Sequence, residues 1–189
     1  MSISYYMEKN QTEDITVSPP VLEMLTVANE YCLFFEKAES YAMQDILDYF
    51  HKIGPLLYLK GSLVPAVKIE DAGPGDRYVT EEQWEGVFKI LREKFGKNDI
   101  YYTHDHNNDS VESSLSDNLA DIYQDMKDFV MLYQKNTVIA RQQSIILIRD
   151  LYRSRWGPAL LNGLAAVHHI LFHDSISPDL LKNEEGWLL

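Results

Sequence analysis

The chain has 189 residues and a net charge of −12 at pH 7, and 46% of its residues are hydrophobic. This acidic balance argues against general binding to nucleic acids or anionic membranes, because each phosphate needs a lysine or arginine to neutralise it. The single cysteine, Cys32, cannot form an intrachain disulfide. We see neither a signal peptide nor an apolar run of the roughly 18 residues that a membrane span needs. We therefore expect a cytoplasmic protein.

The first part of the chain predicts two helices after a polar start. Residues 1–17 have no apolar pattern, so we expect a loose N-terminal arm. Apolar residues at helical spacing then predict helices over 18–37 and 40–59, the second of which should kink or break at Pro55. Residues 60–79 are rich in glycine and proline, which predicts a long loop before the next helix.

The rest of the chain is more strongly patterned. A capping box that begins at Thr80 predicts a helix that ends at Gly96. Residues 97–112 are polar and predict a second long loop. Three further helices are predicted over the ranges 113–133, 137–152 and 156–172. The first two should be antiparallel neighbours, because the joint between them is short.

Six predicted helices without a convincing alternating strand indicate an all-α fold. We therefore expect a single-domain helical bundle of about six helices with two long polar loops. The bundle should span residues 18–175, and residues 176–189 should form a short C-terminal tail.

A row of aspartates is the most distinctive chemical pattern in the sequence. Four of them recur at spacings of four, four and three on one face of the helix over 113–133: Asp117, Asp121, Asp125 and Asp128. Like charges at this spacing repel, so the row needs either a positive partner or an exposed face. Counting back from the short joint places Arg149 and Arg153 level with the row, which favours Asp–Arg pairs between the helices. A solvated face and metal ligation by two or three of the aspartates are the alternatives.

Histidines form two further groups. The segment 104–109 resembles the start of a calcium-binding loop, but Ser110 stands where that loop needs a glycine, and its two histidines are an alternative pair of transition-metal ligands. In the last helix, His169 and His173 share a face, as helical zinc ligands do, although histidines near a helix C-terminus also stabilise it through the helix dipole. His168 is the candidate site residue, because it faces differently and follows small residues that could line a cavity.

One motif favours an enzyme. Residues 81–85 have the form E-E-x-x-E, with which all-helical nucleoside triphosphate pyrophosphohydrolases hold magnesium. Those enzymes place an E-x-x-D pair one helix later. The comparable pair here is Asp125 and Asp128, with aspartate in the first position and a longer separation. First-turn acids also suit a helix N-terminus on their own. The enzymatic alternative is therefore a metal-dependent hydrolase with helix-borne carboxylates.

The chain resembles an uncharacterised bacterial family that is catalogued as a domain of unknown function. The resemblance rests on SLSDNLADIYQDMKDF at 114–129, on RSRWGPALLNGLAAVH at 153–168 and more loosely on the helix near Val21, and it covers about residues 20–175. It implies an all-helical fold without an assigned activity. Positions that match the family in these segments are Asp117, Asp121, Asp125, Trp156 and His168.

The favoured hypothesis is a protein that acts by binding a partner protein or a small ligand, without a cofactor or a bound metal. The sequence lacks the glycine-rich and nucleophile motifs of the common nucleotide-binding and hydrolytic enzymes. A homo-oligomer is a further alternative for the partner. The candidate site residues are Asp117, Asp121, Asp125, Arg149, Arg153, Trp156 and His168.

Overall fold

Six α-helices and one β-hairpin make up the part of the chain that the computed structural model describes, which is residues 14–68, 77–104, 107–135 and 137–173. The all-α class and the six predicted helices are therefore confirmed. Most of the predicted N-terminal arm, part of the first long loop and the C-terminal tail lie outside the described residues. The last residues of the predicted arm, Ile15–Val17, form a 3₁₀ turn whose Thr16 is buried.

The first two helices are α1 (Pro19–Phe35) and α2 (Met43–Leu63). The α2 helix continues through Pro55, so the predicted break there is wrong, whereas the alternative, a kink, stays a prediction. Tertiary packing outweighs the cost of the proline here. A Cβ atom at the preceding Gly54 would lie 2.8 Å from Leu164 Cδ2, so the glycine lets α2 and α6 approach closely.

The third helix, α3 (Glu81–Phe95), begins and ends as its sequence predicts. Gln83 N donates to Thr80 Oγ1 and Thr80 N donates to Gln83 Oε1, which completes the capping box. Gly96 stops the helix with φ +50°, a value that glycine adopts without strain. Local sequence chemistry thus defines both ends of this element.

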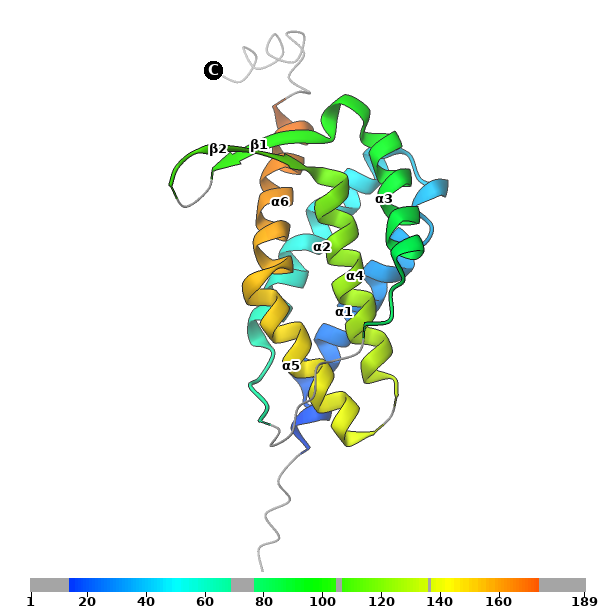
Figure 1. Cartoon of the computed structure of the whole chain (residues 1–189), viewed down its shortest axis with the longest axis vertical. Helices are drawn as coiled ribbons and strands as arrows, with labels where there is room; N and C mark the ends of the chain where they lie inside the picture. The colour runs from blue at the N-terminus through cyan, green and yellow to red at the C-terminus, as the bar shows by residue number, and fades with distance from the viewer. Residues whose placement is uncertain (1–13, 69–76, 105–106, 136, 174–189) are drawn as a thin grey trace, which may run out of the picture.

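The predicted second loop, 97–112, is wrong in part, because it contains a β-hairpin. Strand β1 (Ile100–His104) pairs antiparallel with β2 (Ser110–Ser114). The hairpin lies across the end of α6 (Figure 1). The Asp99 carboxylate anchors its base, because it accepts hydrogen bonds from Ser114 Oγ at 2.9 Å and Ser116 N at 2.8 Å. This contact joins the hairpin to the start of the following helix.

The central helix is α4 (Leu115–Tyr133), which contacts α1, α3, α5 and α6. It is followed by α5 (Val138–Ser154) and α6 (Trp156–Phe172), and α5 runs back along α4 as the short joint predicts (Figure 1). Large buried side chains from α4 itself and from the other helices fill the core: Tyr31, Phe35, Phe50, Phe95, Phe129 and Trp156. The aspartate row thus lies on the most enclosed helix of the bundle.

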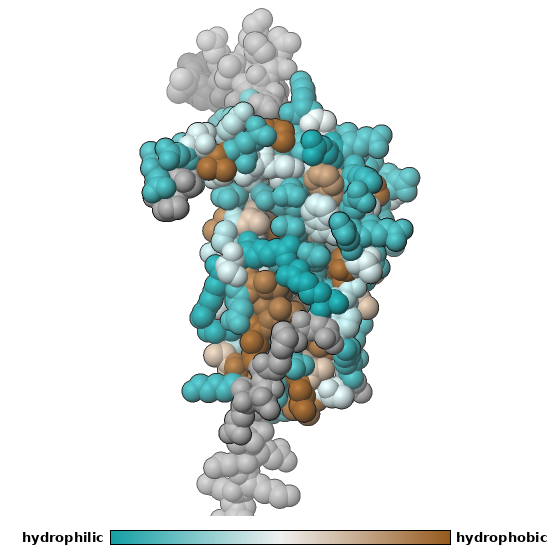
Figure 2. All heavy atoms as spheres, in the orientation of Figure 1, coloured by the Kyte–Doolittle hydropathy of each residue, from teal (hydrophilic) through white to brown (hydrophobic). Residues whose placement is uncertain are grey.

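The outer surface is mostly polar. Figure 2 shows a band of hydrophilic side chains across one face and a group of hydrophobic ones below it, over the region of α5. Within the described residues, none of the helices combines the length and hydropathy that crossing a membrane requires.

Candidate functional site

The aspartate row on α4 becomes steadily more buried along the helix. Asp117 is exposed and Asp121 is half-buried, whereas the side chains of Asp125 and Asp128 are 0% and 1% exposed. The shared face is thus present, but it is not a uniform surface. Its last two members are carboxylates inside the protein, where a charge needs a partner.

Arg155 neutralises the middle of the row. Its Nη1 donates to Asp125 Oδ1 at 2.9 Å, and its Nη2 donates to Asp121 Oδ1 at 2.9 Å and to Gln124 Oε1 at 2.8 Å. The indole Nε1 of Trp84 on α3 adds a bond of 3.1 Å to Asp121 Oδ1. One guanidinium therefore bridges two turns of α4 and fixes both carboxylates.

The prediction that Arg149 and Arg153 hold the aspartates is wrong in the choice of arginine. In the described part of the chain, the ion pairs to Asp121 and Asp125 from the α5–α6 region come from Arg155, and Arg153 is exposed. The physical reason is the turn between the helices. Arg155 has φ −135° and ψ −79°, so the chain leaves the α5 axis there and this side chain reaches α4.

Asp128 holds the segment that leads into α3. Its Oδ1 accepts backbone hydrogen bonds from Tyr78 N at 2.7 Å and Val79 N at 2.9 Å. The neighbouring Arg77 is about half-exposed, and its Nη1 lies 3.9 Å from both Asp125 Oδ1 and Asp128 Oδ2. This buried carboxylate thus fixes backbone, whereas Arg77 is a looser ionic partner.

Burial dominates the electrostatics of Asp125. It raises the pKa of this carboxyl to about 7, against the opposing effect of Arg155 and Arg77 and with a further increase from Asp121 and Asp128. Burial, then the charge of Asp121, also raises the pKa of Asp117. Asp125 Oδ2 and Asp128 Oδ2 are both buried and accept no hydrogen bond from the described residues. Asp125 is therefore a buried carboxyl whose raised pKa lies near neutral pH.

Metal ligation has little geometric support in this cluster. Among the described residues, no three histidine, cysteine, aspartate or glutamate side chains gather as a metal site would require. The Oδ1 atoms of the buried aspartates are already bound to Arg155 and to backbone amides, and Glu85 of the E-E-x-x-E motif pairs with Lys89 at 2.8 Å on the surface. Three residues of the magnesium motif, Glu85, Asp125 and Asp128, thus have other partners.

The other two candidate residues do not join this cluster. Trp156 is fully buried, and its indole Nε1 donates to Ile148 O at 3.1 Å. It packs so closely on Gly61 of α2 that a Cβ atom there would collide with the ring. His168 is exposed near the far end of α6, with its ring centroid 4.8 Å from that of Phe172 and 6.0 Å from that of His51. Trp156 is thus a core residue, and His168 belongs to a separate aromatic group.

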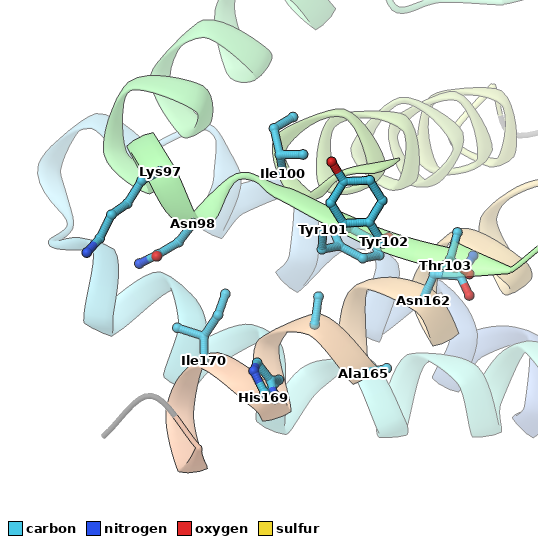
Figure 3. Close-up of a pocket in the computed structure, with 11 residues that line it drawn as sticks. Lys97, Asn98, Ile100, Tyr101, Tyr102, Thr103, Asn162, Ala165, His169 and Ile170 are labelled. Carbon is cyan, nitrogen blue, oxygen red and sulfur yellow. The ribbon is translucent and has the colours of Figure 1, made fainter. Parts of the chain in front are cut away.

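A cavity of about 490 Å³ lies between the hairpin and α6, away from the aspartates. Three elements line it: the turn Gly96–Asn98, strand β1 and one face of α6. Figure 3 shows the strand crossing α6, with Asn98 and Ile170 reaching toward the same space from the turn and the helix. The residues that line it are Lys97, Asn98, Ile100, Tyr101, Tyr102, Thr103, Asn162, Ala165, Ala166, His169 and Ile170.

The cavity combines apolar walls with a few polar groups, as ligand sites do. Ala165 and Ala166 are small, which leaves space beneath the strand. Asn118 on α4 donates to the Tyr101 hydroxyl and so fixes that ring at the wall. His169 stacks on His173, with ring centroids 5.1 Å apart. The arrangement is a partly preformed site that opens to solvent.

The comparisons with known proteins agree with the observed architecture. The sequence model of a domain of unknown function, DUF5063, matches residues 16–173. The chain belongs to this family. The crystal structure of protein BF1032 from Bacteroides fragilis is also similar, with a TM-score of 0.74 and 33% identity over 82% of this chain and 94% of that one. No curated protein sequence matches the chain.

Membership in the DUF5063 family confirms the resemblance that the sequence indicates, and it leaves the function unknown. Neither the description of the family nor the name of protein BF1032 states an activity, so nothing in them supports the hydrolase alternative. The match includes both the aspartate cluster and the cavity.

Sequence reasoning missed the cavity in this DUF5063 protein, although two signals were present. The small residues before His168 indicate a helix face that could line a cavity, and Ile100–Thr103 is rich in aromatic and β-branched residues, which favour strands. Neither signal says that these segments meet, because they lie far apart in the sequence.

Proposed function

We propose that this protein binds a small ligand with an anionic group and a planar or apolar body in the cavity between β1 and α6. The observation that carries the proposal is the charge of the lining. Lys97 and His169 contribute to it, and no aspartate or glutamate does among the described residues, although the whole chain has 29 acidic residues against 17 basic ones. A cavity without carboxylates on a strongly acidic protein is the place where an anion meets least repulsion.

The walls support a planar or apolar ligand body. Tyr101 and Tyr102 provide aromatic surface, and Ala165 and Ile170 provide aliphatic surface on the opposite side. Neutral polar side chains supply donors and acceptors that would orient the ligand: Asn98, Thr103 and Asn162. The volume of about 490 Å³ suits one small molecule.

The experiment uses 1-anilinonaphthalene-8-sulfonate, an aromatic anion whose fluorescence rises in apolar sites. We expect saturable binding to the native protein, and loss of that binding in Ala165→Trp, because the indole would fill the cavity from an exposed position of α6. The matched control is Ala66→Trp, which places the same side chain at another exposed alanine, outside the lining.

Removal of the positive charge of Lys97 tests whether the cavity prefers an anionic ligand. Lys97→Gln should weaken dye binding about two- to fivefold, which is the effect of removing one exposed cation from near an anion. Lys52→Gln removes the same charge at an exposed position of α2 and should leave the affinity unchanged. Equal dye binding by the native protein and all four variants would place the dye elsewhere and overturn the proposal.

We also propose a cytoplasmic location and no direct binding to nucleic acid or membranes. The net charge of −12 supports the second part, and the single cysteine, which is buried, supports the first. Fractionation of the source cells and a gel-shift assay with duplex DNA at low salt test these two expectations. Membrane-bound protein or a retarded DNA band would contradict them.

A further inference from the structure

The segment Arg77–Thr80 is attached to α4 at one buried point. Two successive backbone amides, those of Tyr78 and Val79, donate to the same Asp128 oxygen, and the Val79 side chain is buried beside them. Thr80 then opens the capping box of α3. The amide bonds to Asp128 therefore attach this segment, which leads directly into α3, to α4.

The charges around this point are unevenly matched. The Asp125 carboxylate faces Asp121 and Asp128 from its own helix, Arg155 from the α5–α6 turn and Arg77 from the attached segment. Arg155 makes three hydrogen bonds of 2.8–2.9 Å, but Arg77 stays 3.9 Å from its two carboxylates. On the α1 side lies Cys32, a neutral thiol whose pKa burial raises to about 12. The buried charge of Asp128 thus has only a distant cation, the guanidinium of Arg77.

Protonation of Asp125 would remove the excess negative charge at this buried point. Asp125 and Asp128 are one helical turn apart, and each has a buried oxygen that accepts no hydrogen bond from the described residues. Protonation of Asp125 removes one of two adjacent buried charges and supplies an O–H donor for a neighbouring carboxylate oxygen. Two carboxylates that share a buried site commonly hold one proton between them.

We propose that the buried Asp125–Asp128 pair is a proton-controlled latch that holds the segment Arg77–Thr80 on α4. With the proton bound, the pair carries one negative charge, and Asp128 holds the two backbone amides. Loss of the proton leaves two adjacent buried charges, and release of the segment lets water reach them. The latch is therefore tighter below neutral pH and looser above it.

The direction of this pH dependence follows from the linkage between proton binding to Asp125 and release of the segment. Burial is the largest cause of the raised pKa of Asp125, so exposure in the released state lowers that pKa toward its usual value. The released state then binds the proton less well than the closed state, and rising pH favours release. One proton changes the release equilibrium by at most about tenfold per pH unit, and the change levels off above the pKa of the closed state.

Hydrogen exchange of the Tyr78 and Val79 amides measures the latch directly. After correction for intrinsic exchange, we expect their protection factors in the native protein to fall by up to about tenfold per unit between roughly pH 5 and 7 and to level off near pH 8. In Asp125→Asn, which is neutral at every pH, protection should stay at its low-pH value. In Asp150→Asn, an exposed acid on α5, the native pH profile should persist.

Two arginine variants keep the test decisive if Asp125→Asn does not fold. Arg77 lowers the pKa of Asp125, so Arg77→Gln should move the midpoint of the protection profile to higher pH. Arg153→Gln removes the same charge from an exposed position on α5 and should leave the midpoint unchanged. A flat profile in the native protein, or a native profile in Asp125→Asn or Arg77→Gln, would overturn the latch.

Discussion

The two sites of this molecule differ in their access to water. In the aspartate row, the side chains of Asp125 and Asp128 are 0% and 1% exposed, so water does not reach them. Their carboxylates are bound to Arg155 and to backbone amides. The cavity under β1 is open, and Tyr102 at its edge is 68% exposed. The aspartate row, which is the most distinctive chemical pattern in the sequence, thus holds the interior of the bundle together. The cavity, in contrast, is lined by residues that form no recognisable sequence pattern.

This difference predicts opposite results from mutation. Substitutions in the cluster should cost stability and make it depend on pH. Substitutions in the cavity should change binding and leave stability almost untouched.

The largest effect is expected from Arg155→Ala. Removing this guanidinium leaves Asp125 buried without its close cation, which typically costs about 3–5 kcal/mol of unfolding free energy. The loss should be largest near pH 8 and smaller near pH 5, because a protonated Asp125 needs the cation less. Urea denaturation at the two pH values measures it. Arg153→Ala is the control and should change the free energy by less than about 0.5 kcal/mol. Equal losses in the two variants would contradict the assignment of Arg155.

Asp128→Ala should have the next largest effect. It leaves the amides of Tyr78 and Val79 without their acceptor, and together with the lost ionic contact we expect a cost of about 2–3 kcal/mol. Urea denaturation measures this as well. The exposed Asp117, replaced by alanine, provides the comparison on the same helix face and should cost far less. A similar cost at both positions would mean that burial of the row has no energetic consequence.

The sequence predicts these two sites to very different extents. Helical spacing places the aspartates on one face, and the caps at Thr80 and Gly96 fix the ends of α3, because both depend on residues near in sequence. The choice of Arg155 depends on the backbone turn between α5 and α6, and Arg77 comes from a segment without periodicity. These contacts arise from tertiary packing, which spacing cannot show.

The hairpin was missed for a related reason. Its strands are largely exposed, so they show no clear alternation of buried apolar and polar residues, and their stability comes from backbone pairing and from Asp99 at the base. The cavity exists only where β1 meets α6. A site between two such distant segments can be found in the structure, but not in either pattern alone.

The Asp125 carboxyl should make the stability of the fold depend on pH. The pKa of Asp125 is raised to about 7 in the folded protein, so the folded state binds its proton more tightly than the unfolded chain does. The contribution of Asp125 to stability is therefore greatest at low pH and falls by at most about 1.4 kcal/mol per pH unit until the folded pKa is passed. Asp125→Asn should remove this slope, as measured by the difference between native and variant unfolding free energies from about pH 5 to 8. A difference that does not change with pH would show that Asp125 keeps its charge throughout.

The smallest expected effect on stability distinguishes the cavity from the cluster. Ala165 is exposed and Lys97 is exposed, so neither removes core contacts when it is replaced. Ala165→Trp and Lys97→Gln should therefore change the unfolding free energy by less than about 0.5 kcal/mol, although both should reduce binding of an aromatic anion. A loss above about 1 kcal/mol would mean that the cavity is part of the packed core. If stability stays native while binding falls, the open site is available for function, because the bundle does not depend on it.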